Sequence, residues 1–229
     1  MELSKRLLAV AEYVEEKIKV ADIGTDHAYI PIYLAKYKKA KKIIAMDINK
    51  GPLNRAKKNI QKHKLDNLIE TRLSNGLEQL KPYEVDTIII SGMGGLLINK
   101  IINKSSEIIN TTPRLILQPQ SEIHKVRYNL HDLGFAITDE KLIYEDGKFY
   151  FVIVADKGLE RYNSISDYYY GKCLISKKDN ILKLFLEKEL NKKNQILHKL
   201  KKEKTNNSLK RKKELTDEIN RIEEVLTCL

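Results

Sequence analysis

The fold class rests on residues 20–31, which read Val20-Ala21-Asp22-Ile23-Gly24-Thr25-Asp26-His27-Ala28-Tyr29-Ile30-Pro31. Apolar residues between positions 18 and 23 predict a buried strand, which a glycine turn joins to a helix over residues 28–38. That turn carries two carboxylates and a histidine. In an open α/β sheet, the carboxyl ends of the strands form the ligand crevice. We therefore expect a cofactor to bind at this turn.

Length and composition predict one well-buried domain with a smaller element beside it. The 229 residues are 42% apolar and 32% charged, enough for a domain of about 150–170 residues. No stretch approaches the roughly 20 apolar residues of a membrane helix, and the N-terminus lacks the apolar core of a signal peptide. Cys173 and Cys228 form no disulfide or ligand pattern. We expect a cytoplasmic protein with no membrane partner.

The chain is strongly basic, with 42 Lys and Arg against 31 Asp and Glu and a net charge of +11. This surplus favours a polyanionic partner such as nucleic acid, because Lys and Arg contacts to phosphates displace counterions. A Lys-, Ile- and Asn-rich composition of the kind that AT-rich genomes produce would give the same surplus without such a partner.

Strand and helix patterns alternate along the first two thirds of the chain. We expect strands at 18–23, 41–47, 67–73, 85–91 and 114–117, and helices at 2–16, 28–38, 51–63, 77–80, 96–109 and 121–133. Residues 136–144 and 148–155 flank Asp146-Gly147, a hairpin signal. Five strand–helix alternations predict an α/β fold, a parallel sheet with helices on both faces. The hairpin inserts one antiparallel strand into it.

The composition shifts near Leu159, so we expect two domains, 1–158 and 159–229. Leucines and isoleucines recur at helical spacing over 182–200 and again over 215–229, on either side of a polar turn at Thr205–Ser208. This pattern predicts an antiparallel helical hairpin of coiled-coil type. From Gly171 onward there are sixteen basic and nine acidic residues, +7 of the net +11. The hairpin is either a nucleic-acid-binding element or a solvated or oligomerising coiled coil.

An acid at the end of the second strand points to a nucleoside cofactor. Asp47 lies about twenty residues past the first glycine turn, where such acids accept hydrogen bonds from ribose hydroxyls. Both NAD and S-adenosylmethionine fit it. An NAD site requires further glycines for the pyrophosphate, but Gly24 is followed by Thr25, Asp26 and His27. An anionic Asp26 would repel a pyrophosphate and tolerate an ammonium or sulfonium, which favours S-adenosylmethionine.

Two further turns face the same crevice. Asn75-Gly76 follows the third strand, where a polar side chain can contact the adenine amine or simply form an Asn-Gly turn. Gly92-Met93-Gly94-Gly95 follows the fourth strand, either as the wall that faces the methyl group or as a tight helix entry. His27 is a base, a ligand for the donor or a structural donor, and Tyr29 stacks on a base or merely packs. No histidine has a partner at metal-ligand spacing, so we expect no metal site.

Together these segments resemble the bacterial tRNA (adenine-N1)-methyltransferase family that modifies adenine 22 in the D arm. The resemblance covers most of the chain. It runs through Ser4–Leu7, Asp22–Pro31, Gly51-Pro52-Leu53, Ser91–Gly95 and Leu115–Pro119, and extends to the basic hairpin at the end.

The resemblance implies a class I (Rossmann-like) methyltransferase fold with S-adenosylmethionine as donor and tRNA as partner. It assigns the donor contacts to Asp22, Gly24, Asp26 and His27, the ribose to Asp47, the adenine side to Asn75 and Gly76, and the methyl-facing wall to Met93 and Gly94. The family commonly has an acid where this chain has Asn75, whose amide can still contact the adenine amine.

The chemistry of adenine N1 agrees with these residues. Its in-plane lone pair attacks the methyl group without prior deprotonation, so placement and desolvation are the enzyme's main work. A carboxylate such as Asp26 would stabilise the cationic product, and Asp26, Tyr29 and Met93 are the candidate catalytic residues. The alternatives are a methyltransferase acting on a small molecule or a protein, and a non-catalytic nucleic-acid-binding module. A monomer is favoured over an oligomer.

Overall fold

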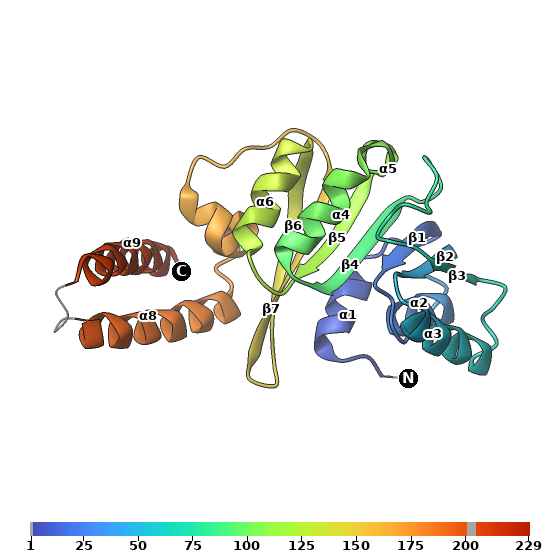
Figure 1. Ribbon diagram of the computed structural model, residues 1–229, viewed down its shortest axis with the longest axis horizontal. Helices are drawn as coiled ribbons and strands as arrows, with labels where there is room; N and C mark the ends of the chain where they lie inside the picture. The colour runs from blue at the N-terminus through green and yellow to red at the C-terminus, as the bar shows by residue number, and fades with distance from the viewer. Residues whose placement is uncertain (1, 201–204) are drawn as a thin grey trace. The chain divides into compact units, whose positions relative to one another are not determined.

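The computed structural model describes residues 2–200 and 205–229. The chain forms two compact units, the first ending at Arg161 and the second beginning at Tyr162, a few residues past the boundary expected from composition. Figure 1 follows the chain through both units. Within the described residues, no helix combines the length and the apolar character needed to cross a membrane.

The first unit is built on a seven-stranded sheet in the order β3-β2-β1-β4-β5-β7-β6. The strands are β1 Ile18–Ile23, β2 Ala40–Asp47, β3 Ile69–Leu73, β4 Thr87–Met93, β5 Arg114–Pro119, β6 Phe135–Glu145 and β7 Lys148–Lys157. Strands β1 to β5 pair in parallel, while β7 runs antiparallel to both of its neighbours, β5 and β6. The α/β class and the single inserted antiparallel strand are therefore confirmed.

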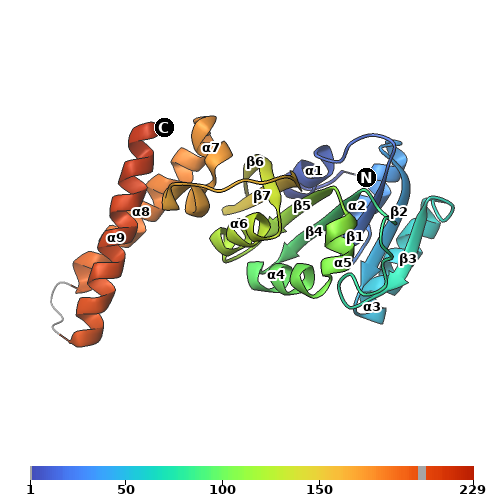
Figure 2. The same ribbon diagram turned by 90° about the horizontal axis from the view of Figure 1, so that it is seen from above.

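Helices cover both faces of the sheet, as the alternation predicts. They are α1 Lys5–Glu12, α2 Tyr29–Lys36, α3 Lys50–Lys62, α4 Gly95–Lys104, α5 Ser106–Thr111 and α6 Ile123–Asp132. Buried residues of α1, α2 and α3 share one apolar cluster with Val20, Ile43, Ile89 and Ile116 of the central strands. Figure 2 shows α1 and α4 on opposite sides of the sheet. Burial on both faces explains the continuous Ile88-Ile89-Ile90 run of β4.

Three of the expected helices differ most from the structure. Residues 77–80 form turns and irregular chain rather than a helix, because Arg72 binds the Gln79 carbonyl at 2.6 Å and the Ser74 side chain accepts the Gln79 N–H. The helix expected over 96–109 is two helices, α4 and α5, separated at Ser105, whose φ of −123° and ψ of 43° are not helical. The first helix is shorter than 2–16, since the Ser4 side chain caps it and it ends at Glu12.

The second unit contains the expected pair of long helices, α8 Asn180–Leu200 and α9 Asn206–Cys228, preceded by a π-helical turn, Asp167–Gly171, and by α7 Lys172–Ser176. The two long helices lie side by side and run in opposite directions (Figure 1). Leu182, Leu186, Leu215 and Ile219 are buried in this unit. The expected polar turn is wrong at 206–208, which are helical because the Thr205 side chain caps α9 by accepting the Ser208 N–H.

Candidate functional site

A cavity of about 340 Å³ opens at the carboxyl ends of β1 and β4. β1 lies between β2 and β4, so the strand order reverses here, and such switch points are where open α/β sheets bind ligands. The cavity is lined by predicted site residues of the first turn, namely Asp22, Gly24, Asp26, His27 and Tyr29, and by Ser91 and Gly92. Its volume lies within the usual range for small-molecule sites.

Asp22 is the buried charge of the cavity. It lies near the end of β1, is 4% exposed, and has a pKa of about 6. Burial raises this pKa most, the Thr25 hydroxyl opposes the rise, and the Asp47 carboxylate adds to it. A buried carboxylate held in this way gains from a cationic ligand, because an ammonium would relieve both the burial and the repulsion.

Gly24 is required where it stands. Its φ is +77°, and a Cβ at this position would collide with the Cε of Met93. Met93 ends β4, which extends beyond the expected residue 91 and pairs Met93 with Pro119. The first turn and the Gly92–Gly95 segment therefore face each other closely, as expected for the two walls of a donor site.

Asp26 is not the free anion that the sequence suggests. Arg55 of α3 donates to its Oδ1 from Nε at 3.1 Å and from Nη2 at 2.7 Å. Its carboxylate also lies 3.7 Å from His27 Nε2. The His27 and Tyr29 rings stack, with centroids 5.1 Å apart and planes 11° from parallel. The mouth of the cavity therefore holds a paired carboxylate beside a flat aromatic surface, on which a base can stack.

Asp47 ends β2, next to the first turn. Its Oδ1 accepts the Asn49 N–H at 2.8 Å, and in the part of the chain that the structure describes its Oδ2 has no hydrogen bond. The Gly24 and Thr25 N–H groups both donate to the Met46 carbonyl, which fixes the turn beside this acid. An acceptor oxygen at the carboxyl edge of β2 fits the hydroxyls of a ribose.

Asn75 and Gly76 lie in the loop Ser74–Glu84, which follows β3 and does not line the cavity. Asn75 is exposed, its amide donates to Glu78 at 2.7 Å, and it borders a separate hollow of about 90 Å³ with residues of α4. Gly76 approaches the Ile101 side chain. The Ser74 N–H donates to the Asp47 carbonyl, so the loop begins directly beside the ribose acceptor.

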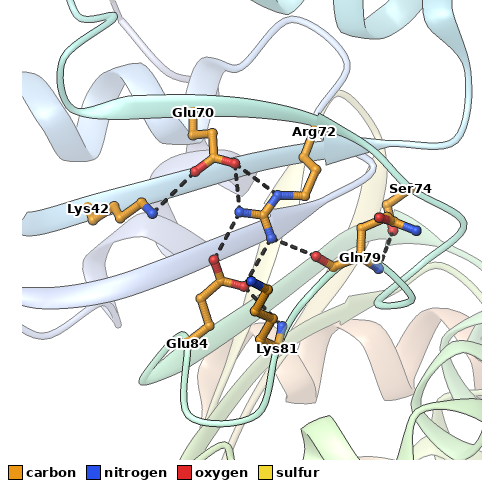
Figure 3. A network of polar contacts seen from close by, with 7 residues as sticks. All are labelled: Lys42, Glu70, Arg72, Ser74, Gln79, Lys81 and Glu84. Carbon is orange, nitrogen blue, oxygen red and sulfur yellow. Dashed lines mark hydrogen bonds and ion pairs between the residues drawn. The ribbon is translucent and has the colours of Figure 1, made fainter.

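Arg72 ties this loop to the sheet, as Figure 3 shows. Its guanidinium binds Glu70 at 2.6 Å on its own strand and both oxygens of Glu84 at 2.9 and 3.0 Å at the far end of the loop. It also donates to the Gln79 carbonyl, and the Arg72 side chain is only 19% exposed. The hydrogen bonds from Arg72 lower the pKa of Glu84 to about 2. A bidentate pair between an arginine and a carboxylate fixes the relative orientation of the two side chains and also strengthens their interaction.

Sequence reasoning gave no role to Arg6, Arg55 or Gln120, although Arg6 and Gln120 line the cavity. Arg6 belongs to a motif that carries the family resemblance, whereas no local pattern marks Arg55, whose partner is 29 residues away. Gly94, a predicted contact, caps α4 and lies against Ser121. Among the described residues, no three His, Cys, Asp or Glu side chains gather so that they could hold a metal ion.

These residues suit S-adenosylmethionine: a buried acid for its ammonium, an acceptor for its ribose, and a glycine turn that leaves room beside Met93. Fold and site together define a Rossmann-like, S-adenosylmethionine-dependent methyltransferase. Residues 20–224 match the model of the family described as TrmK, tRNA (adenine(22)-N(1))-methyltransferase. The chain belongs to this family, so the resemblance, the enzyme class and the methyl donor expected from the sequence are confirmed.

Known relatives support this family assignment. The tRNA (adenine(22)-N(1))-methyltransferase of Bacillus subtilis is 42% identical over 158 residues, which span 69% of this chain and 66% of that protein. A Streptococcus pneumoniae putative tRNA (m1A22) methyltransferase in complex with S-adenosyl-L-methionine is 34% identical, with a TM-score of 0.89 over 98% of this chain and 100% of that one. M. capricolum TrmK in complex with S-adenosyl-homocysteine is 31% identical, with a TM-score of 0.87 over 100% and 99%.

Proposed function

We propose that this chain transfers a methyl group from S-adenosylmethionine to N1 of adenine 22 in tRNA, and that the cavity between β1 and β4 is where transfer occurs. The observation that carries the proposal is the coincidence of family membership with a cavity built by the Asp22–Pro31 and Ser91–Gly95 motifs. The alternatives of a small-molecule or protein substrate, or a non-catalytic module, have no comparable support.

We assign the donor to residues along the edge of the sheet. Asp22, Gly24, Asp26 and His27 hold the methionine end, Asp47 holds the ribose, and Asn75 and Gly76 lie on the adenine side. Met93 and Gly94 form the wall that faces the methyl group. In this order the donor would run from β1 past β2 to the loop Ser74–Glu84, which Arg72 keeps in place.

When bound, S-adenosylmethionine supplies an electrophilic methyl group on a sulfonium. Adenine N1 attacks with its in-plane lone pair, so the protein needs no general base and contributes chiefly position and desolvation. We assign Tyr29, stacked with His27, to the target base. Asp26 stabilises the cationic product, and because Arg55 already compensates part of its charge, this contribution is small.

The second unit supports tRNA binding by its charge. Lys210 and Lys213 of α9 are exposed, and within the described ranges 2–200 and 205–229 neither makes an ion pair. Free lysines of this kind contact phosphates and contribute affinity without reading sequence. We infer that the helical unit holds the tRNA while the first unit carries the reaction. With tRNA as substrate, we also infer a cytoplasmic location.

Nucleoside analysis tests the proposal. Unmodified tRNA carrying adenine 22 is incubated with the protein and methyl-labelled donor, digested, and examined by mass spectrometry. We expect label in 1-methyladenosine, and none when position 22 of the same tRNA is guanosine. Label in another nucleoside, or equal label in both tRNAs, would overturn the proposed function.

A further inference from the structure

Arg6 is fixed at the wall of the cavity by groups that lie far from it in sequence. The Glu145 carboxylate, from the β6–β7 hairpin, accepts the Lys5 and Arg6 backbone N–H groups at 2.6 and 3.2 Å and so anchors the start of α1. The Arg6 side chain donates from Nη1 to Gln118 Oε1 at 2.9 Å. Its guanidinium carbon lies 5.5 Å from the centre of the Tyr150 ring. These contacts hold the guanidinium in one place.

The positive charge of Arg6 is not compensated by the protein. Its acceptors, Gln118 and Ser91, are neutral, and the described part of the chain offers no carboxylate within ion-pair distance of the guanidinium. Among the residues that the structure describes, the Arg6 side chain donates from Nη1 alone, so the N–H groups on Nε and Nη2 remain for a ligand. A Cβ on Gly92 would lie 3.8 Å from Arg6 Nη1 and 3.8 Å from the Gln120 amide nitrogen. Two hydrogen-bond donors, the Arg6 guanidinium and the Gln120 amide, therefore lie close to Gly92.

The cavity is thus dipolar, with Asp22 on the first-turn side and Arg6 with Gln120 on the Gly92 side. An α-amino acid carries its ammonium and carboxylate on one carbon, so both charges must be met within one small site. A nucleotide phosphate in the same cavity would meet Arg6 but would also face the buried Asp22. Resting on the proposed function, we infer that Arg6, with the Gln120 amide, binds the carboxylate of the donor's methionine end.

The test compares two ligands that differ only in this carboxylate, S-adenosylmethionine and its decarboxylated form. Calorimetry on the full chain without tRNA gives both dissociation constants. Charge-assisted hydrogen bonds to a carboxylate correspond to about 10- to 100-fold in affinity. We expect the wild type to bind S-adenosylmethionine more tightly than the decarboxylated form by about this factor. Arg6→Gln should remove that preference while leaving the affinity for the decarboxylated form unchanged.

Lys5→Gln is the matched control, since it removes the same charge from the same helical turn and keeps the backbone contact to Glu145. It should leave both dissociation constants unchanged. Arg6→Lys keeps the charge and should retain part of the preference, which separates ligand binding from a packing role. Equal weakening of both ligands by Arg6→Gln would make Arg6 merely structural. If Arg6→Gln changed only the KM for tRNA, Arg6 would instead contact a phosphate of the tRNA.

Equal weakening of both ligands, or an effect on the KM for tRNA alone, would overturn the inference. If the wild type binds the donor and forms 1-methyladenosine while Arg6→Gln behaves as the wild type, the inference fails and the proposed function stands. A wild type that binds no S-adenosylmethionine would instead defeat the proposed function.

Discussion

Replacing Asp22 with Asn should stabilise the ligand-free protein while weakening donor binding. The pKa of the Asp22 carboxyl rises from 3.8 to about 6 on folding, chiefly because the group is buried. Each pKa unit corresponds to about 1.36 kcal/mol, so keeping this carboxylate ionised at pH 7 costs the fold up to about 3 kcal/mol. A neutral amide of similar size removes this cost. We expect Asp22→Asn to gain about 1–3 kcal/mol at pH 7, or about 2–4 °C in Tm for each kcal/mol.

The gain should depend on pH with a definite sign. Because the folded pKa is raised, the penalty is fully present above pH 6 and fades as the pH falls toward 3.8, where both states protonate the group. The stability difference between Asp22→Asn and the wild type should therefore shrink below about 1 kcal/mol at pH 4. Thermal or urea unfolding of both proteins across this range measures it.

Donor affinity should move in the opposite direction. An ammonium binds the ionised carboxylate, so wild-type affinity for S-adenosylmethionine should fall as the pH drops below 6. Asp22→Asn should bind about 10- to 100-fold more weakly at pH 7, with no such pH dependence. A variant that is less stable than the wild type at pH 7, or that keeps full donor affinity, would refute the reasoning about this carboxylate.

Three further changes probe other parts of the site. Gly24→Ala places a methyl group against the Met93 side chain at a φ of +77°. We expect stability to fall by about 1–2 kcal/mol and donor affinity, measured by calorimetry, to fall at least about tenfold. Arg72→Gln frees the loop Ser74–Glu84 and should cost about 1–3 kcal/mol in an unfolding titration, with several-fold weaker donor binding. Lys210→Ala combined with Lys213→Ala should lower the slope of log Kd for tRNA against log salt by about 2 and leave the donor Kd unchanged.

Each change has a matched control in the same chain. Gly134 has a φ of +72° with nothing near a Cβ, so Gly134→Ala carries the backbone strain alone and should spare donor binding. Lys42→Gln removes a partner of Glu70 without touching the loop, so its donor affinity should match the wild type. Lys41→Ala removes an exposed charge at the amino end of β2 and should not alter the salt slope. If a control variant showed the same change in donor affinity or salt slope as its test variant, the corresponding argument would fail.

The order of the strands and helices along the chain could be predicted from the sequence because hydrophobic runs and turns are local signals, whereas the order of the strands within the sheet required the fold. The Ile88-Ile89-Ile90 run, the Asp-Gly hairpin and the glycine after β1 each specify their own element. The missing helix at 77–80 could not be predicted, since it depends on the side chain of Arg72, on the preceding strand β3, binding the Gln79 carbonyl. Tertiary hydrogen bonds of this kind override local helix propensity.

The residues of the first turn could be placed at one cavity from the sequence, but Arg6 and Gln120 and the electrostatics of the cavity could not. Asp22, Gly24, His27 and Tyr29 line one cavity, as the single turn that carries them implies. The charge balance required the fold, because Arg55 pairs with Asp26 across 29 residues and Arg6 reaches the cavity from the first helix. The sequence predicts a free anion at Asp26, but Arg55 pairs with that carboxylate. Within the described residues, the carboxylate of the cavity without an ion pair is the buried Asp22.

A crystal structure of the protein with S-adenosylhomocysteine tests the central claim most directly. We predict the ligand in the cavity between β1 and β4, with its ammonium within hydrogen-bond distance of the Asp22 carboxylate and its ribose hydroxyls on Asp47. Ligand density at another place, or in this cavity with the Asp22 carboxylate facing no ligand atom, would contradict the account.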